Sequence, residues 1–305
     1  MAVATDEYAL LTESAGLLDR SERAKFSVRG GEAADFLQGQ VSNDVEALSP
    51  GSGCYATVLS VKGKLRTDLR ILRGDDFYWL DTEAIGHAVL RHMLTTYTLG
   101  RDVQWEDLTE DHALLSLVGP EVDRLVETPP PAEEHAFVDT GSGLLVRTAL
   151  GLDLLCSAGQ ADGWRERVGV EPVSEEAVEC LRIESGRPRL GYDMDAETMP
   201  QEAGINERAV SFTKGCYVGQ ETVARLHYRG KPNRHLRGLR LSEPADRGSE
   251  ILLGERVVGR LGSTCISPRL GPIALALVRR EAVPGDTVLV DGAEARVTGL
   301  PFASD

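Results

Sequence analysis

The order of predicted elements constrains the fold of this 305-residue chain more than any other feature. Helical and strand patterns alternate through the first two thirds, whereas the segment from Leu236 onward contains only short strands. In that last segment, Gly254-Glu255 and Asp291-Gly292 separate consecutive strands, and Asp-Gly is a favoured hairpin turn. Because short strands joined by tight turns close readily into barrels, we expect an α+β fold followed by a small β-barrel.

The first hundred residues show the pattern of an antiparallel sheet with two helices. One helix is expected where Ala33, Phe36 and Leu37 recur at helical spacing. A second is expected over 83–99, ended by Gly100, and its buried face is expected to carry Ile85, Ala88, Val89, His92 and Met93. A hairpin turn is expected at 61–64, and the predicted strands cover residues 25–28, 54–59, 65–72 and 77–80.

The middle of the chain repeats this mixture of strands and helices. Strands are predicted over 114–118, 144–148 and 152–156, which indicates a second α+β lobe. Ser174 is a suitable N-cap for a helix that runs to about residue 185. Glu184 is therefore expected at the C-terminal end of that helix. We predict an α+β module of two lobes over residues 1–230 and a β-barrel domain over residues 231–305.

The charge of the chain limits the class of partner. Lys and Arg number 33 against 48 Asp and Glu, a net charge of -15. Such a surface disfavours nucleic acid and anionic membranes, which select basic surfaces. The N-terminus lacks a basic segment followed by an apolar one, and no apolar run approaches the roughly 20 residues that cross a bilayer. We expect a cytoplasmic protein without direct binding to nucleic acid or membrane.

The cysteines give no sign of a disulfide framework or a local metal site. They are widely spaced, and no CxxC pair occurs, so neither a zinc site nor an iron-sulfur cluster is expected. A reducing compartment and the absence of a bound metal follow as predictions. The five cysteines are Cys54, Cys156, Cys180, Cys216 and Cys265.

Cys216 is the strongest nucleophile candidate. It lies just ahead of a helix that is expected to start near Gly219, and free amides at a helix start together with Lys214 favour thiolate over thiol. With His227 as a base, it would form the centre of a folate-independent cysteine enzyme. The alternative is a small, half-buried residue in a tight turn.

The segment Lys214-Gly-Cys-Tyr-Val-Gly-Gln-Glu221 resembles the signature of YgfZ-type folate-binding proteins. These proteins share a wider family with the aminomethyltransferase (T-protein) of glycine cleavage. The resemblance implies two α+β lobes, interleaved in sequence, around a central folate channel, with a closing barrel. Three further blocks carry it: Phe-Leu-Gln-Gly-Gln-Val-Ser-Asn-Asp-Val over 36–45, Leu-Arg-Ile-Glu-Ser-Gly over 181–186, and the barrel segment over 258–276.

Reduced folate, tetrahydrofolate, is the ligand that this resemblance implies. The turn at Asn43 and Asp44 would line the channel, and Glu184 would grip the pterin ring, whose amino-pyrimidinone edge suits a carboxylate acceptor. Arg234, within a basic stretch, would pair with the glutamate tail of the folate. Lys214 is assigned to the same folate site.

Asp68 is a second catalytic candidate beside Cys216. Aminomethyltransferases carry an acidic pair on this strand, one member of which lies beside the reacting folate nitrogens, whereas this sequence reads Thr67-Asp68. One positioned acid can still orient or protonate a substrate. The alternative is an ordinary strand residue.

The resemblance favours a tetrahydrofolate-binding accessory factor for assembly or repair of iron-sulfur enzymes, linked to tRNA modification. Its partners would be iron-sulfur client enzymes. The alternative is a tetrahydrofolate-dependent aminomethyltransferase that takes its one-carbon unit from a lipoyl carrier protein. The signature at 214–221 favours the first reading, and the incomplete acidic pair at residues 67 and 68 weakens the second.

Overall fold

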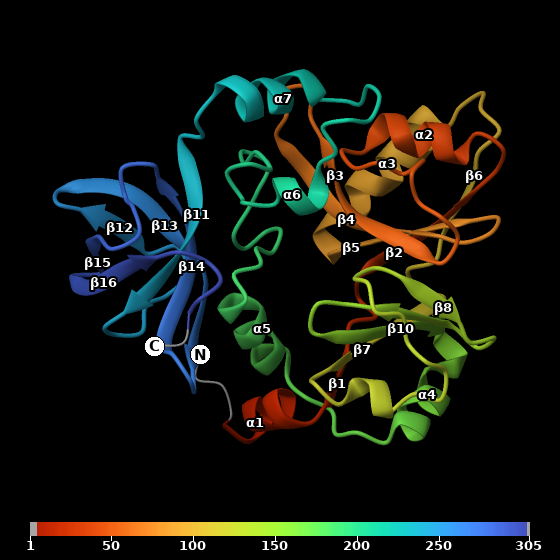
Figure 1. Cartoon of the computed structure of the whole chain (residues 1–305), viewed down its shortest axis with the longest axis horizontal. Coiled ribbons are helices and arrows are strands. Elements are labelled where there is room, and N and C mark those ends of the chain that lie inside the picture. Colours follow the sequence, from red (N-terminus) through yellow and green to blue (C-terminus); the bar gives the residue numbers. More distant parts are fainter. Residues whose placement is uncertain (1–4, 304–305) are drawn as a thin grey trace. The chain divides into compact units, whose positions relative to one another are not determined.

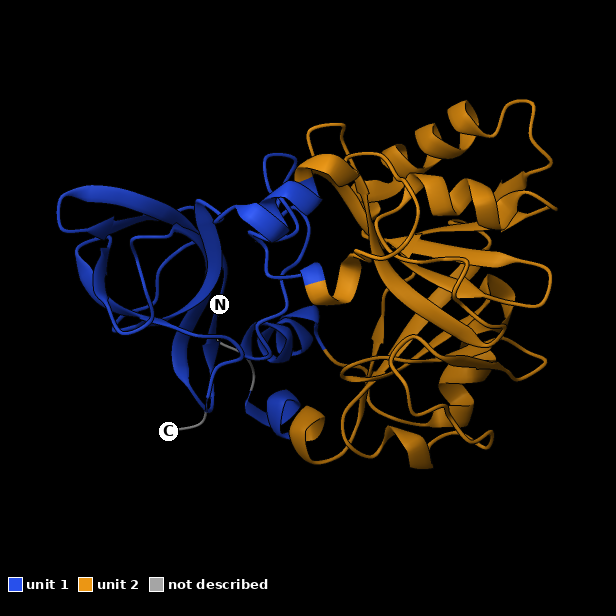
Figure 2. Ribbon diagram, turned by 45° about the horizontal axis from the view of Figure 1, so that its top comes forward, with its two compact units in different colours: residues 1–9, 174–206, 223–305 blue, residues 10–173, 207–222 orange. Residues whose placement is uncertain are grey.

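The structure, a computed structural model, describes residues 5–303. Contacts divide the chain into two compact units, shown in different colours in Figure 2. Unit 1 contains the described residues of 1–9, 174–206 and 223–305, and unit 2 contains residues 10–173 and 207–222. Three helices contribute residues to both groups: α1 (Thr5–Glu13), α6 (Asn206–Ala209) and α7 (Gln220–Arg229).

Unit 2 holds a first antiparallel sheet in the order β3-β4-β5-β2-β6, with two helices packed on it (Figure 1). Phe36 of α2 and Leu90 and Leu94 of α3 enter its core, as their helical spacing requires. The bounds are β2 Ala24–Arg29, α2 Ala33–Gln40, β3 Ser52–Leu59, β4 Leu65–Arg73, β5 Tyr78–Thr82, the 3₁₀ turn η1 Ala84–Gly86, α3 His87–Tyr97 and β6 Gln104–Asp107.

A second antiparallel sheet of unit 2 follows the order β1-β7-β10-β9-β8. Because β1 precedes β2 in the chain, the two lobes are interleaved in sequence. Leu72 and Trp79 of the first sheet join Leu114 and Phe137 in one apolar cluster. The bounds are β1 Gly16–Asp19, β7 His112–Val118, η2 Val122–Arg124, β8 Phe137–Asp139, β9 Leu144–Arg147, β10 Gly151–Ser157, η3 Ala158–Gln160 and α4 Ala161–Val168.

Unit 1 contains a closed barrel in the order β11-β14-β13-β12-β15-β16, with α5 packed against β13 and β14. The two predicted turns join hairpins whose ends pair Leu253 with Arg256 and Val290 with Ala293. The predicted fold class is confirmed. The bounds are α5 Glu175–Glu184, β11 Arg234–Leu241, β12 Glu250–Leu253, β13 Arg256–Ser267, β14 Gly271–Arg279, β15 Thr287–Val290 and β16 Ala293–Thr298.

The predicted buried face of the helix over 83–99 is wrong in part. Residues 84–86 form a 3₁₀ turn ahead of α3. Because a 3₁₀ helix has three residues per turn, this turn shifts which side chains of the segment face the core. Ile85 is 66% exposed, and His92 is exposed as well. Met93 is buried and Val89 packs against the core, as predicted, and they are joined there by Leu90 and Leu94.

Within the described residues, every helix is too short or too polar to cross a membrane. The boundary between residues 230 and 231 stays a prediction.

Candidate functional site

The turn at Asn43 and Asp44 in unit 2 is fixed by its own side chains. Asn43 Nδ2 donates to the carbonyl oxygens of Tyr55 at 2.8 Å and Arg208 at 3.0 Å, while Asn43 Oδ1 accepts from the Asp44 amide at 2.9 Å. Asp44 Oδ1 accepts from Gln38 Nε2 at 2.9 Å. The amide of Asn43 therefore holds the turn against strand β3.

Lys214 is buried beneath this turn. Its Nζ donates to the carbonyl oxygens of Gln38 at 2.6 Å, Val41 at 2.8 Å and Asn43 at 2.7 Å. An ammonium has three donors, so these bonds use all of them. Burial lowers the pKa of Lys214 to about 8. Lys214 thus fixes the end of α2 and the adjoining turn, and its predicted contact with folate stays a prediction.

The loop that carries Cys216 is packed against the β3–β4 hairpin. Helix α7 begins at Gln220, as predicted. Gly219 has a φ of +86°, and a Cβ there would lie 2.5 Å from the carbonyl oxygen of Ser60. Tyr217 is buried with its ring 5.1 Å from Lys214 Nζ, and burial raises the pKa of Tyr217 to about 12. Between these fixed residues, Cys216 is exposed.

Asp68 on β4 is a buried carboxyl, 8% exposed, with two unlike oxygens. Tyr55 donates its hydroxyl to Oδ2 at 2.6 Å. Oδ1 is buried and has no hydrogen-bond partner among the described residues. Burial raises the pKa of Asp68 above its ordinary value, and the charge of Glu83 adds to this. A buried polar atom without a partner is costly, and a catalytic role is one of the explanations for its presence.

Glu184 is the last residue of α5 and is buried in unit 1. Tyr8 donates its hydroxyl to both carboxylate oxygens, at 2.9 and 3.1 Å. Ser267 donates to Oε1, and Arg269 donates to Oε2 at 2.7 Å. Both oxygens are therefore engaged by the protein itself, and a pterin edge would have to share or displace these donors.

Arg234 opens strand β11 and is also engaged. Its Nε and Nη2 donate to the carboxylate of Glu202 at 3.1 and 2.8 Å, and Nη2 reaches the carbonyl oxygen of Glu197 at 2.9 Å. The side chain lines a hollow of about 990 Å³ on unit 1, together with Arg260 and Arg279. A carboxylate ligand in that hollow would compete with Glu202 for the same guanidinium.

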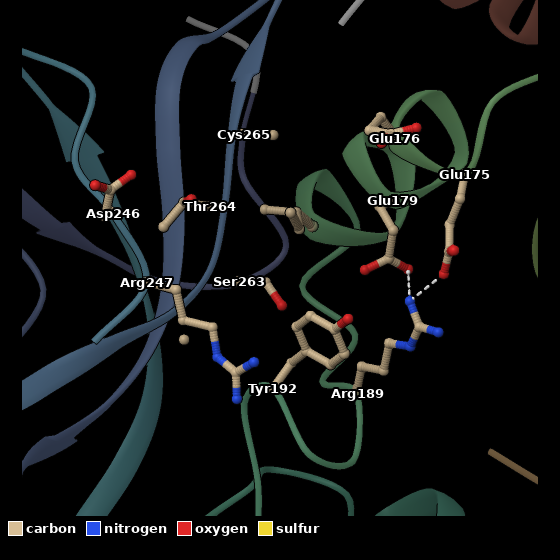
Figure 3. Close-up of a pocket in the computed structure, with 12 residues that line it drawn as sticks. Glu175, Glu176, Glu179, Arg189, Tyr192, Asp246, Arg247, Ser263, Thr264 and Cys265 are labelled. Atoms are coloured by element: carbon tan, nitrogen blue, oxygen red, sulfur yellow. Dashed lines mark hydrogen bonds and ion pairs between the residues drawn. The ribbon is translucent and has the colours of Figure 1, made fainter. Parts of the chain in front are cut away.

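A second cavity of unit 1, of about 380 Å³, contains none of the predicted site residues (Figure 3). Arg189 is ion-paired with Glu175 and lies 3.4 Å from Glu179. Its guanidinium lies 4.9 Å from the ring centre of Tyr192, and that of Arg247 lies 4.5 Å from the same ring. The cavity was not predictable from the sequence, because its walls come from three separated segments.

The structure thus brings the predicted residues together in two groups. Unit 2 joins Asn43, Asp44 and Lys214 directly, and Tyr55 links this turn to Asp68. Cys216 belongs to the same unit, whereas Glu184, Arg234 and His227 belong to unit 1. The pairing of Cys216 with His227 stays a prediction.

Two family profiles and several known proteins match this chain. Residues 1–138 match the GCVT N-terminal domain, and residues 234–303 match the glycine cleavage T-protein C-terminal barrel domain. An aminomethyltransferase from Rubrobacter xylanophilus is 31% identical over 97% of this chain and 85% of its own length. The chain belongs to the aminomethyltransferase family.

Other comparisons agree with this family. An aminomethyltransferase from Prosthecochloris aestuarii is 30% identical over 98% of this chain and 90% of its own length. The solved structure of the glycine cleavage system aminomethyltransferase T from Bartonella henselae covers 98% of this chain and 89% of that one, with a TM-score of 0.90 and 23% identity. This last likeness concerns the fold.

The groups that hold the two predicted acids, Asp68 and Glu184, in place were not predicted from the sequence. Tyr55 bonds Asp68, and Tyr8, Ser267 and Arg269 bond Glu184. The predicted hairpin places Tyr55 on the strand next to that of Asp68, but the bulge that sets the register between the two residues has no local sequence signal. The partners of Glu184 lie more than 80 residues away in sequence and leave no local pattern.

Proposed function

We propose that the protein is a tetrahydrofolate-dependent aminomethyltransferase that uses Asp68 as its acid and base. The observation that carries the proposal is the Asp68 carboxyl, with Oδ2 held by Tyr55 and Oδ1 buried without a partner among the described residues. The family membership supplies the reaction class and the folate. The carrier that brings the one-carbon unit would be a lipoyl protein.

The chemistry needs a group that can move a proton near neutral pH. The donor's amine must leave as ammonia, and a folate nitrogen must lose a proton as it takes the methylene carbon. A carboxyl with a raised pKa retains its proton closer to neutral pH and so acts more effectively as an acid and then as a base. The Tyr55 bond fixes the rotamer of Asp68, and Oδ1 is the atom left to exchange the proton.

The other predicted folate contacts have mixed support. The turn at Asn43 and Asp44 is rigid, which suits a wall of a binding site. Glu184 and Arg234 have the right chemistry for pterin and tail, but each is already paired within unit 1. We therefore propose that folate binding replaces the Arg234–Glu202 pair, and that Asp68 contributes more to transfer than to affinity.

A methylamine-transfer assay with a loaded lipoyl carrier and tetrahydrofolate tests this function. Asp68→Asn should lower kcat by roughly 10²- to 10⁴-fold with little change in folate affinity, because only proton transfer is lost. Asp75→Asn, an exposed acid just beyond β4, is the matched control and should retain activity. Absence of transfer by the wild type, or full activity of Asp68→Asn, contradicts the proposal.

A second function, the iron-sulfur accessory role, is favoured by one observation. Cys216 is exposed on a loop that Lys214, Tyr217 and Gly219 fix in place, which suits transient chemistry with a partner protein. Under this alternative, Cys216→Ser would retain folate affinity by calorimetry. It would lose the rescue of iron-sulfur enzymes and of tRNA thiomodification in cells lacking their own homologue. Full rescue by Cys216→Ser would count against this role.

A further inference from the structure

We propose that Cys180 and Cys265 form an oxidisable dithiol, a site at which a hydroperoxide closes a disulfide inside unit 1. The two sulfur atoms lie 3.5 Å apart, on helix α5 and barrel strand β13. Both residues are buried, and both are free thiols in this structure. The widely spaced cysteines of the sequence gave no hint of this pair.

The distance between the two sulfur atoms is short enough for a disulfide to form after a small movement. A disulfide requires a sulfur separation of about 2.05 Å, so the atoms need to approach by about 1.5 Å. Side-chain rotation and a small shift of α5 along β13 can supply that movement, since these two elements already pack together. In the described part of the chain, the sulfur atoms of Cys54, Cys156 and Cys216 make no hydrogen bond to another cysteine.

The two cysteines differ in their access to solvent. Cys265 is one of the residues that line the cavity of about 380 Å³ shown in Figure 3 and is 7% exposed, whereas Cys180 is fully buried and is not part of that lining. The same cavity is lined by four acidic residues against two arginines, which disfavours anionic reagents. A small neutral hydroperoxide fits this entrance. The four acids are Glu175, Glu176, Glu179 and Asp246.

The reaction balances with the hydroperoxide as the sole oxidant. The Cys265 sulfur attacks the peroxide oxygen, the O–O bond breaks, and an alcohol or water leaves with a proton, so that a sulfenic acid remains. The Cys180 sulfur then attacks the sulfenic sulfur, the S–O bond breaks, and water leaves with the second thiol proton. Two thiols are oxidised by two electrons, and one peroxide is reduced.

The surroundings of the two cysteines predict that the pair reacts slowly with a hydroperoxide. The hydrogen bond to Cys180 and burial both raise the pKa of Cys265, so little thiolate is present to attack. Exposed Cys216 should therefore react first, and the pair should respond to sustained oxidation.

The bond would act directly on the Glu184 network. Cys180 lies one helical turn before Glu184, and its sulfur is 3.9 Å from Glu184 Oε1. Ser267, which donates to the same oxygen, lies two residues after Cys265 on β13. A disulfide would tie the helix to the strand on both sides of this carboxylate. It would also close a loop between residues 85 positions apart, which restricts the unfolded chain.

Peptide mapping of the oxidised full chain tests the proposal. The wild-type protein is treated with graded hydrogen peroxide, quenched, alkylated in denaturant and digested without reductant. We expect a Cys180–Cys265 cross-linked peptide that dithiothreitol removes. We also expect the Tm of the oxidised protein to rise by roughly 5–10 °C relative to the reduced protein.

Two variants separate the pair from other thiols. Cys156→Ser removes a buried cysteine of unit 2 and should form the same cross-link. Cys265→Ser should give no cross-link, and Cys265→Ala serves if the serine variant does not fold. The proposal is overturned if both cysteines are recovered fully alkylated once Cys216 is oxidised, or if the cross-link forms only in denaturant. Neither readout depends on the transferase activity.

Discussion

At the scale of single residues, Asp68 imposes a stability cost that follows from its environment. Burial raises its pKa above the ordinary value of 3.8, so the folded chain holds this proton to higher pH than the unfolded chain does. The contribution of Asp68 to stability is therefore fully present below about pH 3.8, is lost as pH rises through the raised value, and stays absent at neutral pH.

Asp68→Asn should therefore be more stable than the wild type at pH 7, while losing transfer activity. The amide keeps the shape and can still accept the Tyr55 hydroxyl, but it removes the buried charge. Urea unfolding at pH 7 and at about pH 4 measures the effect, and the advantage should shrink at the lower pH. Asp75→Asn should show neither change. A destabilised Asp68→Asn at pH 7 would mean that the ionised form is the better accommodated one.

The sequence predicted which acidic side chains belong to the candidate site, but it did not predict their hydrogen-bond partners. Asp68 and Glu184 were recognised as acids, and both proved to be buried. The partners of Glu184 come from α1 and from the end of β13, up to 176 residues away. Such contacts depend on how distant segments pack, which a local pattern does not contain.

At the scale of elements, a single β-bulge decides the geometry around Asp68. The β3–β4 ladder shifts by one residue between Val58 and Leu59, and beyond the shift Thr57 pairs with Asp68. Without the bulge, Ala56 would oppose Asp68, and Tyr55 would face the other side of the sheet. The hairpin was predictable from its turn, but the bulge was not, so the Tyr55–Asp68 bond was not predictable either.

The conformation of the loop that carries Cys216 requires a glycine at position 219, where the loop meets helix α7. Gly219→Ala places a methyl group 2.5 Å from the Ser60 carbonyl oxygen and forces a non-glycine residue to a φ of +86°. We expect a loss of about 2 kcal/mol of unfolding free energy and faster alkylation of Cys216. Gly215→Ala, where no atom lies within 4 Å of the added methyl, is the control for both measurements. Equal stability of the two variants would mean that the loop is not held by this contact.

At the scale of the whole molecule, the net charge of -15 predicts a dependence on salt. Like charges repel in the compact state, and raising the ionic strength from 0.1 to 1 M shortens the screening length from about 10 to 3 Å. The Tm at pH 7 should therefore rise with sodium chloride over this range. The rise should be smaller near pH 5, where some carboxylates are protonated. An equal rise at both pH values would assign it to a non-electrostatic effect of the salt.

The barrel was predictable from its hairpins, whereas the composition of unit 1 was not. Asp291 and Gly292 have φ values of 50° and 87°, as the predicted turn requires. Nothing in the local pattern reveals that α5 packs on β13 and β14, or that Tyr8 reaches the end of α5. Those contacts link segments from the beginning, the middle and the end of the chain.

The assembly of unit 1 from distant segments of the chain has a consequence for its synthesis on the ribosome. Tyr8 must wait for 176 further residues before Glu184 is made, which takes roughly 10–35 s at ordinary rates of translation. The barrel waits longer still, because its closure pairs the first strand, β11, with the last, β16. Residues 10–173 can complete their two sheets while the nascent chain is still growing. Tyr8 can reach Glu184 only after those sheets have been synthesised, and the barrel can close only after β16 has been made, so the two units mature at different times.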